Sequence, residues 1–521
     1  FLAVQVGSIG MRAAMARSAA LPSLGGPARR CAAAAPPKSP PLRRPYRRLR
    51  LPPPPLLFLL LLGLAVPAVE ADWWTDSGLK QVLVLDAGSS GTRIHIFNAR
   101  ISPGAHVPEV FQHVRANQTL KLKPGLSSFA LSEDLGGAKS SIEQLLQFAN
   151  KFVAPNRRSI TPVLVKATAG LRAVPLEKAN AVLDRVREVL AASEYQSSSA
   201  WVSIIPGKEE GGLAWVSANY LSGTFRRSSS VSSSLGVIEL GGGSAQVTFE
   251  VAEDQKSLAG EDSYLFTTLQ GTQFRVYAHS YLGYGQDHAQ ERMKAAMSKA
   301  KVDPCYPRGS WQTSLSEPII GAGDSQECIA NIWEHIFSSS HDAPGRYPSE
   351  PRLKGSFVAT ENFYYIRNDL NLPLLGQPKK MEEAAQSVCQ RNFTGDFDEL
   401  PKHCFALAYQ AALIQALQRK TPHGSLFEQN PNIASEDVSL EIVRLINGGE
   451  VDWAVGAAVV HIIQASRLEH DGFTFWGRSA DWSDSAHGLP HASGLIVAAI
   501  GLALGLLLFV RWARRFRGKD A

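Results

Sequence analysis

Several features that identify common classes of protein are scarce in this sequence of 521 residues. It has only five cysteines, and no two of them have the C-x₂₋₄-C spacing of a structural zinc site. None of the thirteen histidines occurs in an H-E-x-x-H pattern, so a zinc-protease site is not predicted either. Hydrophobic residues make up 45% of the chain, which excludes disorder as a description of the whole.

Acidic residues are almost missing from the two ends of the chain. Residues 1–54 contain ten cations and no acid, and residues 511–521 have a net charge of +4. The intervening segment therefore has a net charge of −8, although the whole chain has +6 and a pI near 9.0. Because the positive charge is confined to the ends, nucleic acid is not an expected partner.

Two apolar segments lie next to these basic ends. Leu56–Val69 is fourteen residues long, which is short for a membrane span and typical of a signal sequence. Cleavage and retention as an anchor are both open. Residues 492–510 contain no charge and are followed by arginines, which predicts a transmembrane helix with a cytosolic tail. We therefore expect a basic leader (1–55), a signal peptide or signal anchor (56–71), the end of a stalk (486–491), a transmembrane helix (492–510) and a cytosolic basic tail (511–521).

This topology makes the protein a membrane protein whose body lies in the lumen of the Golgi or ER, or outside the cell. The predicted membrane helix contains Gly501-Leu-Ala-Leu-Gly505, a G-x-x-x-G pattern that can form a helix-dimer face but also occurs by chance. A homodimer through this span is therefore one possibility. In the tail we find no sorting signal that separates Golgi, ER and plasma membrane.

Four cysteines and two glycosylation sequons lie in the body and agree with such a compartment. In an oxidising lumen the cysteines are expected to form two disulfides, and the local pairing among the three possible ones closes the shortest loops. The sequons are expected to carry glycans. The residues concerned are Cys305 with Cys328, Cys389 with Cys404, Asn117 and Asn392.

Hydrophobic periodicity predicts strands that alternate with helices, and therefore an α/β fold. The expected strands are 81–85, 92–97, 162–167, 202–205 and two within 236–251. The expected helices are 140–153, 176–191, 209–221, 402–418 and 455–466.

Two segments of the body resemble each other. Residues 82–97 and 237–249 each have an apolar strand that ends near a carboxylate, Asp86 or Glu239, then a turn of small residues and a second strand. Small residues let successive backbone N–H groups form a nest for phosphate. A carboxylate beside such a nest would repel phosphate unless a divalent cation lies between them, so both acids are predicted to hold a metal, mainly through water.

One such loop alone would be an ordinary hairpin, but two copies predict a clamp for a polyphosphate. The predicted phosphate-binding residues are Ala87, Gly88, Ser89, Ser90, Gly91, Thr92 and Arg93 in the first copy, and Gly241, Gly242, Gly243, Ser244, Ala245 and Gln246 in the second.

Five motifs in order resemble the apyrases, the nucleoside triphosphate diphosphohydrolase family, and most closely the plant-type membrane members with a C-terminal span. They are Asp86-Ala-Gly-Ser-Ser-Gly-Thr-Arg93, Lys166-Ala-Thr-Ala-Gly-Leu-Arg172, the segment Glu209–Leu221, Glu239-Leu-Gly-Gly-Gly-Ser-Ala-Gln246 and Asp452-Trp-Ala-Val-Gly456. The resemblance implies two actin-like (RNase H-like) lobes with the nucleotide in the cleft. Lobe I would hold 76–205 and 449–485, and lobe II 206–448.

The resemblance also implies roles for single residues. Glu210 would be the base, although a glutamate at a helix start can simply complement the helix dipole. Ser244 and Gln246 would orient the attacking water, and Thr168 would lie near the terminal phosphate. Arg172 could bind phosphate or tie the lobe together. The cation would be Ca²⁺ or Mg²⁺, and Glu239, where many relatives have aspartate, would alter the metal preference.

The predicted activity is hydrolysis of nucleoside tri- and diphosphates by direct attack of water, and the preference between them is open. A secretory-pathway UDPase or GDPase, an actin-like kinase and a membrane glycoprotein that only binds nucleotide are the alternatives. The aromatic residues in lobe II that could stack on the base are Phe363, Tyr364, Tyr365 and Tyr409.

Overall fold

The computed structural model describes residues 79–111, 119–226, 234–251, 262–312, 319–338, 343–344, 351, 353–373, 376–392, 402–418 and 438–470. All of them belong to the second of two compact units, Trp73–Ala521, and the first unit is Phe1–Asp72. The predicted leader, both apolar segments, the basic tail and Asn117 lie outside the described residues. Within the described ranges, none of the helices is long and apolar enough to cross a membrane.

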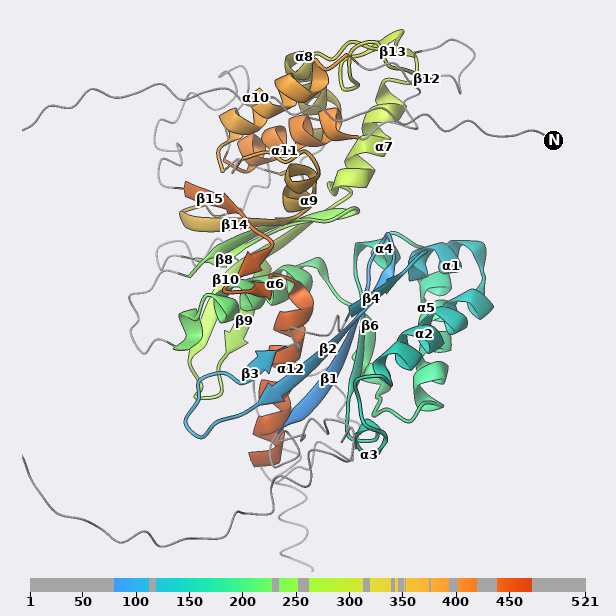
Figure 1. Ribbon diagram of the computed structural model, residues 1–521, viewed down its shortest axis with the longest axis vertical. Helices are drawn as coiled ribbons and strands as arrows, with labels where there is room; N and C mark the ends of the chain where they lie inside the picture. Colours follow the sequence, from blue (N-terminus) through green and yellow to red (C-terminus); the bar gives the residue numbers. More distant parts are fainter. Residues whose placement is uncertain are drawn as a thin grey trace, which may run out of the picture. The chain divides into compact units, whose positions relative to one another are not determined.

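The first sheet has the strand order β3-β2-β1-β5-β6, with β4 paired to β2 (Figure 1). Strands β1 and β2 form an antiparallel hairpin, and β5 and β6 continue from β1 in parallel. The strands are β1 (Lys80–Ala87), β2 (Thr92–Arg100), β3 (Glu109–Phe111), β4 (Thr119–Leu122), β5 (Val163–Ala167) and β6 (Val202–Ile204).

Side chains of β1 alternate between the two faces of this sheet, as the period of a strand requires. Leu83 and Leu85 pack on the helices of one face, and Val82 and Val84 pack on the other face. The first face is covered by α1 (Leu126–Ser132), α2 (Leu135–Ala149) and α5 (Leu176–Ala191); α3 (Pro155–Arg158) and α4 (Ala169–Arg172) are single turns.

The second sheet has the order β15-β14-β7-β8-β10-β9. Its strands are β7 (Gly236–Leu240), β8 (Ser244–Glu250), β9 (Ser263–Thr267), β10 (Gln273–Leu282), β14 (Gly355–Glu361) and β15 (Val438–Ile442). One face carries α7 (Gln286–Ala296), α8 (Ser325–Ile332), α9 (Asn362–Asp369), α10 (Pro378–Cys389) and α11 (His403–Leu417) (Figure 1).

Short elements complete the described part of the chain. They are β11 (Val302–Asp303), β12 (Trp311–Gln312), β13 (Ile319–Gly321), β16 (Leu445–Ile446), β17 (Gly449–Glu450), the 3₁₀ turns Ser199–Trp201 and Thr224–Arg226, and a π-helical turn Trp333–Phe337. The disulfides Cys305–Cys328 and Cys389–Cys404 are formed on the α8, α10 and α11 side of the second sheet.

Two helices, α6 (Gly207–Leu221) and α12 (Trp453–His470), share one core with the inner faces of both sheets. The helices cross at Gly456, where an added Cβ would lie 2.0 Å from the carbonyl oxygen of Leu213. Glycine is therefore required by the close approach of two backbones. Because α12 covers Val82 and Val84 of β1, the last described helix completes the layer around the first sheet.

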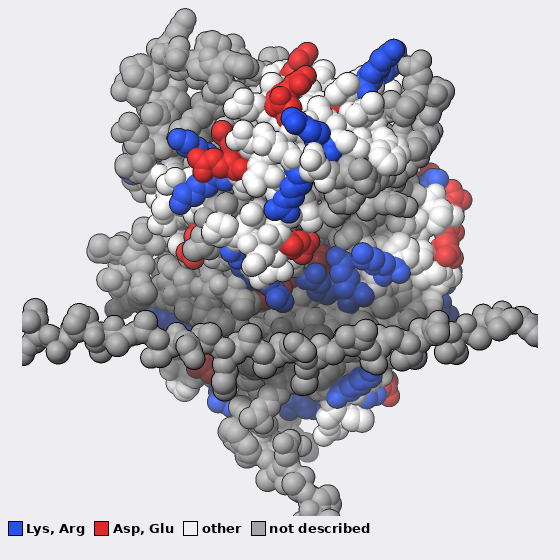
Figure 2. Space-filling model, turned by 45° about the horizontal axis from the view of Figure 1, so that its top comes forward, with Lys and Arg blue, Asp and Glu red and all other residues white. Residues whose placement is uncertain are grey.

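The α/β class predicted from the sequence is confirmed. Helix α2 begins at Leu135 rather than at 140, because Asp134 caps it by accepting a hydrogen bond from the backbone of Gly137 at 2.8 Å. On the face shown in Figure 2, acidic and basic side chains of the described residues are interspersed.

Candidate active site

The two similar segments form two hairpins, each with a carboxylate near the end of its first strand. In the first hairpin Asp86 lies opposite Arg93, and in the second Glu239 lies opposite Gln246. The turns face each other, since a Cβ on Gly242 would lie 3.1 Å from the hydroxyl oxygen of Ser89. Two phosphate loops predicted from separate parts of the chain therefore meet in one place.

Glu210 lies in the first turn of α6 beside these loops and is 6% exposed. Arg172, which ends α4, donates to the Glu210 carboxylate at 2.8 Å and to the Ser244 hydroxyl at 3.2 Å. Gln246 also donates to the Ser244 hydroxyl at 2.8 Å. The structure thus brings together four residues from three separate motifs.

Two opposing influences act on the pKa of Glu210, and the net result is a raised pKa. Burial raises the pKa of its carboxyl, and the adjacent Arg172 guanidinium lowers it. Arg172 also donates to the carbonyl of Ile205 at 3.1 Å. The geometry shows that Arg172 forms an ion pair with Glu210.

Asp86 and Glu239 lie in surroundings that disfavour their ionised forms. Burial raises the pKa of both carboxyls well above the ordinary range, with further increases from Asp452 at Asp86 and from Glu210 at Glu239. One carboxylate oxygen of Glu239, Oε2, is buried and has no hydrogen-bond partner. Such oxygens fit a hard cation such as Ca²⁺ or Mg²⁺. Among the described residues, no group of three or more His, Cys, Asp or Glu is arranged to hold a metal directly.

The remaining predicted loop residues differ in their exposure. Ser90 is exposed and Ser89 is partly exposed, whereas Ala87 and Ala245 are buried, so only their backbones could reach a ligand. Thr92 is completely buried, and its hydroxyl has no partner. Loop backbone is supplied by Gly88, Gly91, Gly241, Gly242 and Gly243.

Thr168 follows β5 and is 5% exposed. Its backbone N–H donates to the carbonyl of Ala87 at 3.2 Å, which ties the second motif to the first loop.

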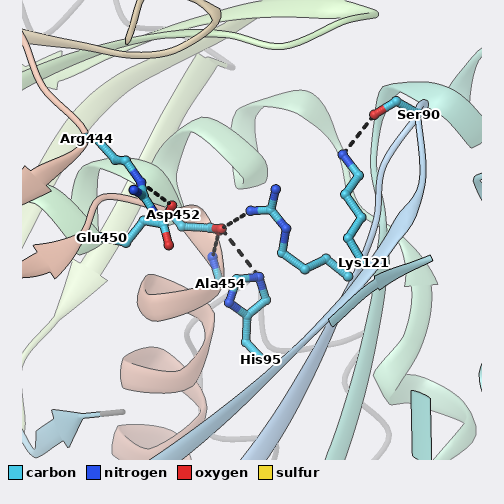
Figure 3. Close-up of polar contacts among 8 residues, drawn as sticks. Ser90, His95, Lys121, Arg444, Glu450, Asp452 and Ala454 are labelled. Carbon is cyan, nitrogen blue, oxygen red and sulfur yellow. Dashed lines mark hydrogen bonds and ion pairs between the residues drawn. The ribbon is translucent and has the colours of Figure 1, made fainter. Parts of the chain in front are cut away.

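Arg93 contacts the fifth motif. Its guanidinium lies 3.4 Å from the Asp452 carboxylate, and Nε2 of His95 lies 3.4 Å from the same oxygen (Figure 3). Burial opposes the charge of Arg93, but Asp452 and Glu361 together raise its pKa. Asp452 also accepts from the backbone of Ala454 at 2.8 Å, so it caps α12.

Two charged residues at the site were missed from the sequence. Glu361 ends β14 with a φ of 58°, and burial, with Asp452, raises its pKa to about 7. Lys121 comes from β4 and donates to the Ser90 hydroxyl at 2.9 Å (Figure 3). Neither lies in a recognisable motif, and only strand pairing brings them to the loops.

The aromatic candidates for base stacking divide into two groups. Phe363 and Tyr409 are completely buried in the core, and the Tyr409 hydroxyl donates to the carbonyl of Tyr284. The expectation that these two could stack on a base is therefore wrong. Tyr364 and Tyr365 are partly exposed, with ring centres 5.8 Å apart.

A cavity of about 500 Å³ lies elsewhere, between α2 and α5, and none of the candidate residues lines it.

Comparison with known proteins decides the family. The sequence pattern of the GDA1/CD39 (nucleoside phosphatase) family matches residues 75–470. The chain belongs to this family. Within the GDA1/CD39 family it is 28% identical over 423 residues to "Probable apyrase 4" of Arabidopsis thaliana, which covers 74% of this chain and 80% of that protein. It is 31% identical over 409 residues to "Ectonucleoside triphosphate diphosphohydrolase 6" of Rattus norvegicus, and the match covers 74% of this chain and 82% of that protein.

A solved structure agrees with the GDA1/CD39 assignment at the level of the fold. A nucleoside triphosphate hydrolase from Neospora caninum matches with a TM-score of 0.54 and 17% identity, over 77% of this chain and 95% of that one. The family places the chain among the apyrase-type phosphoanhydride hydrolases, so it is an enzyme and a nucleotide phosphatase.

Proposed function

We propose that this enzyme hydrolyses the terminal phosphoanhydride bond of nucleoside tri- and diphosphates, with Glu210 as the general base. The observation that supports this most directly is the cluster of Glu210, Arg172, Ser244 and Gln246, joined by contacts of 2.8–3.2 Å where the two phosphate loops meet. A base, a cation and two polar groups at this point are what phosphoryl transfer to water needs.

Hydrogen-bond donors and acceptors define how a water would be held. Gln246 and Arg172 both donate to the Ser244 oxygen, so the Ser244 hydroxyl proton is free to donate elsewhere. Oε1 of Gln246 is buried without a partner and can accept a hydrogen bond. A water here would give one proton to Glu210, hydrogen-bond through the other to Gln246, and direct a lone pair at the phosphorus.

In the proposed reaction the water oxygen attacks the terminal phosphorus and the bond to the bridging oxygen breaks. The bridging oxygen keeps the bonding electrons, Glu210 takes a proton from the water, and the products are inorganic phosphate and the shortened nucleotide. No residue is phosphorylated. Arg172 favours the ionised form of Glu210 that this step needs.

We further propose that Asp86 and Glu239 hold Ca²⁺ or Mg²⁺ through water. The unpartnered Glu239 oxygen and the raised pKa of both carboxyls support this, because a cation would supply the missing positive charge. When bound, such a cation would offset the negative charge of the phosphates next to Asp86 and Glu239.

The anchoring of the enzyme in a membrane, with a lumenal or extracellular body and a cytosolic tail, is part of the proposal. It is supported by the apolar segments at 56–71 and 492–510 and by the basic residues that follow the second one. Pairing through Gly501 and Gly505 would give a homodimer. Glycans at Asn117 and Asn392 fit the same compartment, and Asn392 is exposed just after α10.

The deciding experiment measures phosphate release by the purified chain from ATP, ADP, UDP and GDP, with Ca²⁺ or Mg²⁺ and with chelator. Glu210→Gln should lower kcat by about 10²–10⁴-fold. Glu209→Gln is the matched control. Glu209 directly precedes Glu210 in the same helical turn but makes no contact with Arg172 among the described hydrogen bonds. Release from UDP and GDP alone would assign a diphosphatase, and full activity in Glu210→Gln would contradict the mechanism.

A further inference from the structure

A lysine outside the five motifs, Lys121 on β4, lies against the phosphate loop of the first hairpin. Strand β4 pairs with β2 so that Lys121 lies directly opposite Arg93, and Arg93 lies opposite Asp86 on β1. Residues directly opposite each other in a sheet point to the same face. Lys121, Arg93 and Asp86 therefore form one row across three adjacent strands.

The side chain of Lys121 is held against the loop. A Cβ added to Gly91 would lie 2.8 Å from Cε of Lys121 and 2.6 Å from the carbonyl oxygen of Leu122, so only glycine lets the lysine stem cross here. The ammonium donates to the Ser90 hydroxyl at 2.9 Å (Figure 3). This uses one of its three N–H groups, and within the described part of the chain Lys121 forms no salt bridge.

Two cations directly opposite each other in a sheet destabilise it unless an anion lies near both. Partial burial and the adjacent Arg93 lower the pKa of Lys121, while Asp86 and Glu361 raise it. Arg93 is already paired with Asp452. Asp86 and Glu361 act on both cations, and the Lys121 ammonium keeps two N–H groups with which it can bind a further anion.

The position of Lys121 within the site indicates which part of a substrate it could reach. The groups that act on the charge of Glu210 are Arg172, Gln246 and Asp452, whereas those that act on the charge of Lys121 are Arg93, Asp86, Glu361 and Lys123. Ser89 lies against the second loop, and Ser90, which holds Lys121, is the next residue outward and is exposed. If the terminal phosphate lies at Glu210, Lys121 is on the side of the remaining phosphates.

We propose that Lys121 binds a phosphate oxygen of the leaving-group part of the nucleotide and favours triphosphates over diphosphates. A triphosphate keeps two phosphates in its leaving group and a diphosphate keeps one, so the longer chain gains more from this cation. The inference rests on the proposed function, which places a nucleotide polyphosphate between the loops with its terminal phosphate at Glu210.

The test compares Lys121→Met with Lys123→Met. Both lysines are exposed and lie two residues apart, but in the described hydrogen bonds it is Lys121 that contacts the phosphate loop. Affinities for ATP and ADP are measured by calorimetry in a Glu210→Gln background, and KM and kcat in the otherwise native enzyme. Lys121→Met should weaken ATP binding and raise its KM about tenfold, with a smaller effect for ADP and a kcat within about threefold of the native value. Lys121→Arg should retain most of the ATP affinity.

Equal losses of ATP affinity in Lys121→Met and Lys123→Met would overturn the proposal. They would show that the net positive charge of the region matters, and not a contact between Lys121 and phosphate. Equal losses for ATP and ADP would overturn the predicted selectivity, and a fall in kcat with a lower melting temperature would show a structural role. The binding measurement needs no turnover, so its result is separate from failure of the hydrolytic mechanism itself.

Discussion

Arg172 is the residue that joins the proposed base, Glu210, to the groups proposed to hold the water. Its two terminal nitrogens reach Glu210 and Ser244, which come from α6 and β8. A planar guanidinium with several N–H donors can hold both at once, and a lysine cannot reproduce that geometry. In the proposed mechanism Arg172 is therefore a positioning residue that also favours the ionised form of Glu210.

Replacing Arg172 with methionine should change the pH profile. Without the cation, burial raises the pKa of Glu210 further, so the carboxylate keeps its proton to higher pH. The acid limb of the kcat profile should move to higher pH, and each unit of movement removes about tenfold of the active form below the pKa. Steady-state kinetics from pH 5.5 to 9 provide the measurement. Arg185→Met, on the exposed surface of α5, is the control, and an unmoved acid limb would contradict this role.

Glu239 should lower the stability of the metal-free enzyme at alkaline pH. Its folded-state pKa is raised, so its contribution to stability is present at low pH and is lost as the pH rises through that pKa. Glu239→Gln should therefore raise Tm in chelator by roughly 2 °C or more at pH 8, and by less at pH 5. Added Ca²⁺ should reduce this difference in Tm, because it should stabilise the protein that has Glu239 more than the variant. Thermal unfolding scans measure these Tm values, and the control is Glu441→Gln, which changes an exposed acid on β15. No rise in Tm of Glu239→Gln at pH 8 would contradict the prediction.

Sequence motifs found some residues of the site and missed others for a physical reason. Glu210, Ser244 and Gln246 belong to short motifs whose spacing follows from one helix turn or one hairpin. Glu361 and Lys121 reach the site because β14 pairs with β7 and β4 pairs with β2, over long sequence separations. Burial of Phe363 and Tyr409 also depends on packing, so their exposure could not be read from residue type.

At the scale of the elements, the contact between α6 and α12 is the most demanding. Gly456 lets α12 lie against the backbone of Leu213, and α6 carries Glu210 at its first turn. Any change in the separation of these helices would move the base relative to the phosphate loops.

Gly456→Ala should destabilise the protein, because its Cβ would lie 2.0 Å from a backbone oxygen that cannot rotate away. Overpacking of this kind costs about 1–3 kcal/mol. Urea unfolding measures the loss. The control is Gly136→Ala in the first turn of α2, where the nearest contact is an ordinary 3.5 Å and a helix former should be neutral or slightly stabilising. Equal stability of the two variants would rule out a tight crossing.

Elements with strong local periodicity were predicted well. The expected helix 176–191 coincides with α5, and 402–418 differs from α11 by one residue at each end. Strands β14 and β15 were not predicted, and β14 pairs with β7, far away in the sequence. Strands β9 and β10 form a local hairpin but were also not predicted, because their buried residues do not alternate regularly.

At the scale of the molecule, the two disulfides lie on the helices outside the second sheet, away from α6 and the loops. The sequence predicted that these cysteines form disulfides, but the structure was needed to show that the disulfides lie away from the proposed site.

Removing Cys389–Cys404 by double substitution with alanine should lower the free energy of unfolding by about 3 kcal/mol, as expected for a loop of this length. The kcat at 25 °C should stay within about twofold, because no residue of the proposed site contacts either cysteine in the described hydrogen bonds. Denaturation and kinetics on the same preparation test both. A large fall in kcat with an intact fold would instead link the disulfide to the site.

The return of α12 to the first sheet has a consequence for synthesis. Residues 80–204 leave the ribosome early, but one face of their sheet, with Val82 and Val84, stays uncovered until Trp453–His470 has been made. About 250 residues of the second sheet and its helices must be translated in between. The first sheet therefore cannot complete its core until the last described helix has been synthesised. A chain truncated before Trp453 would contain both loops but would expose the apolar face of this sheet.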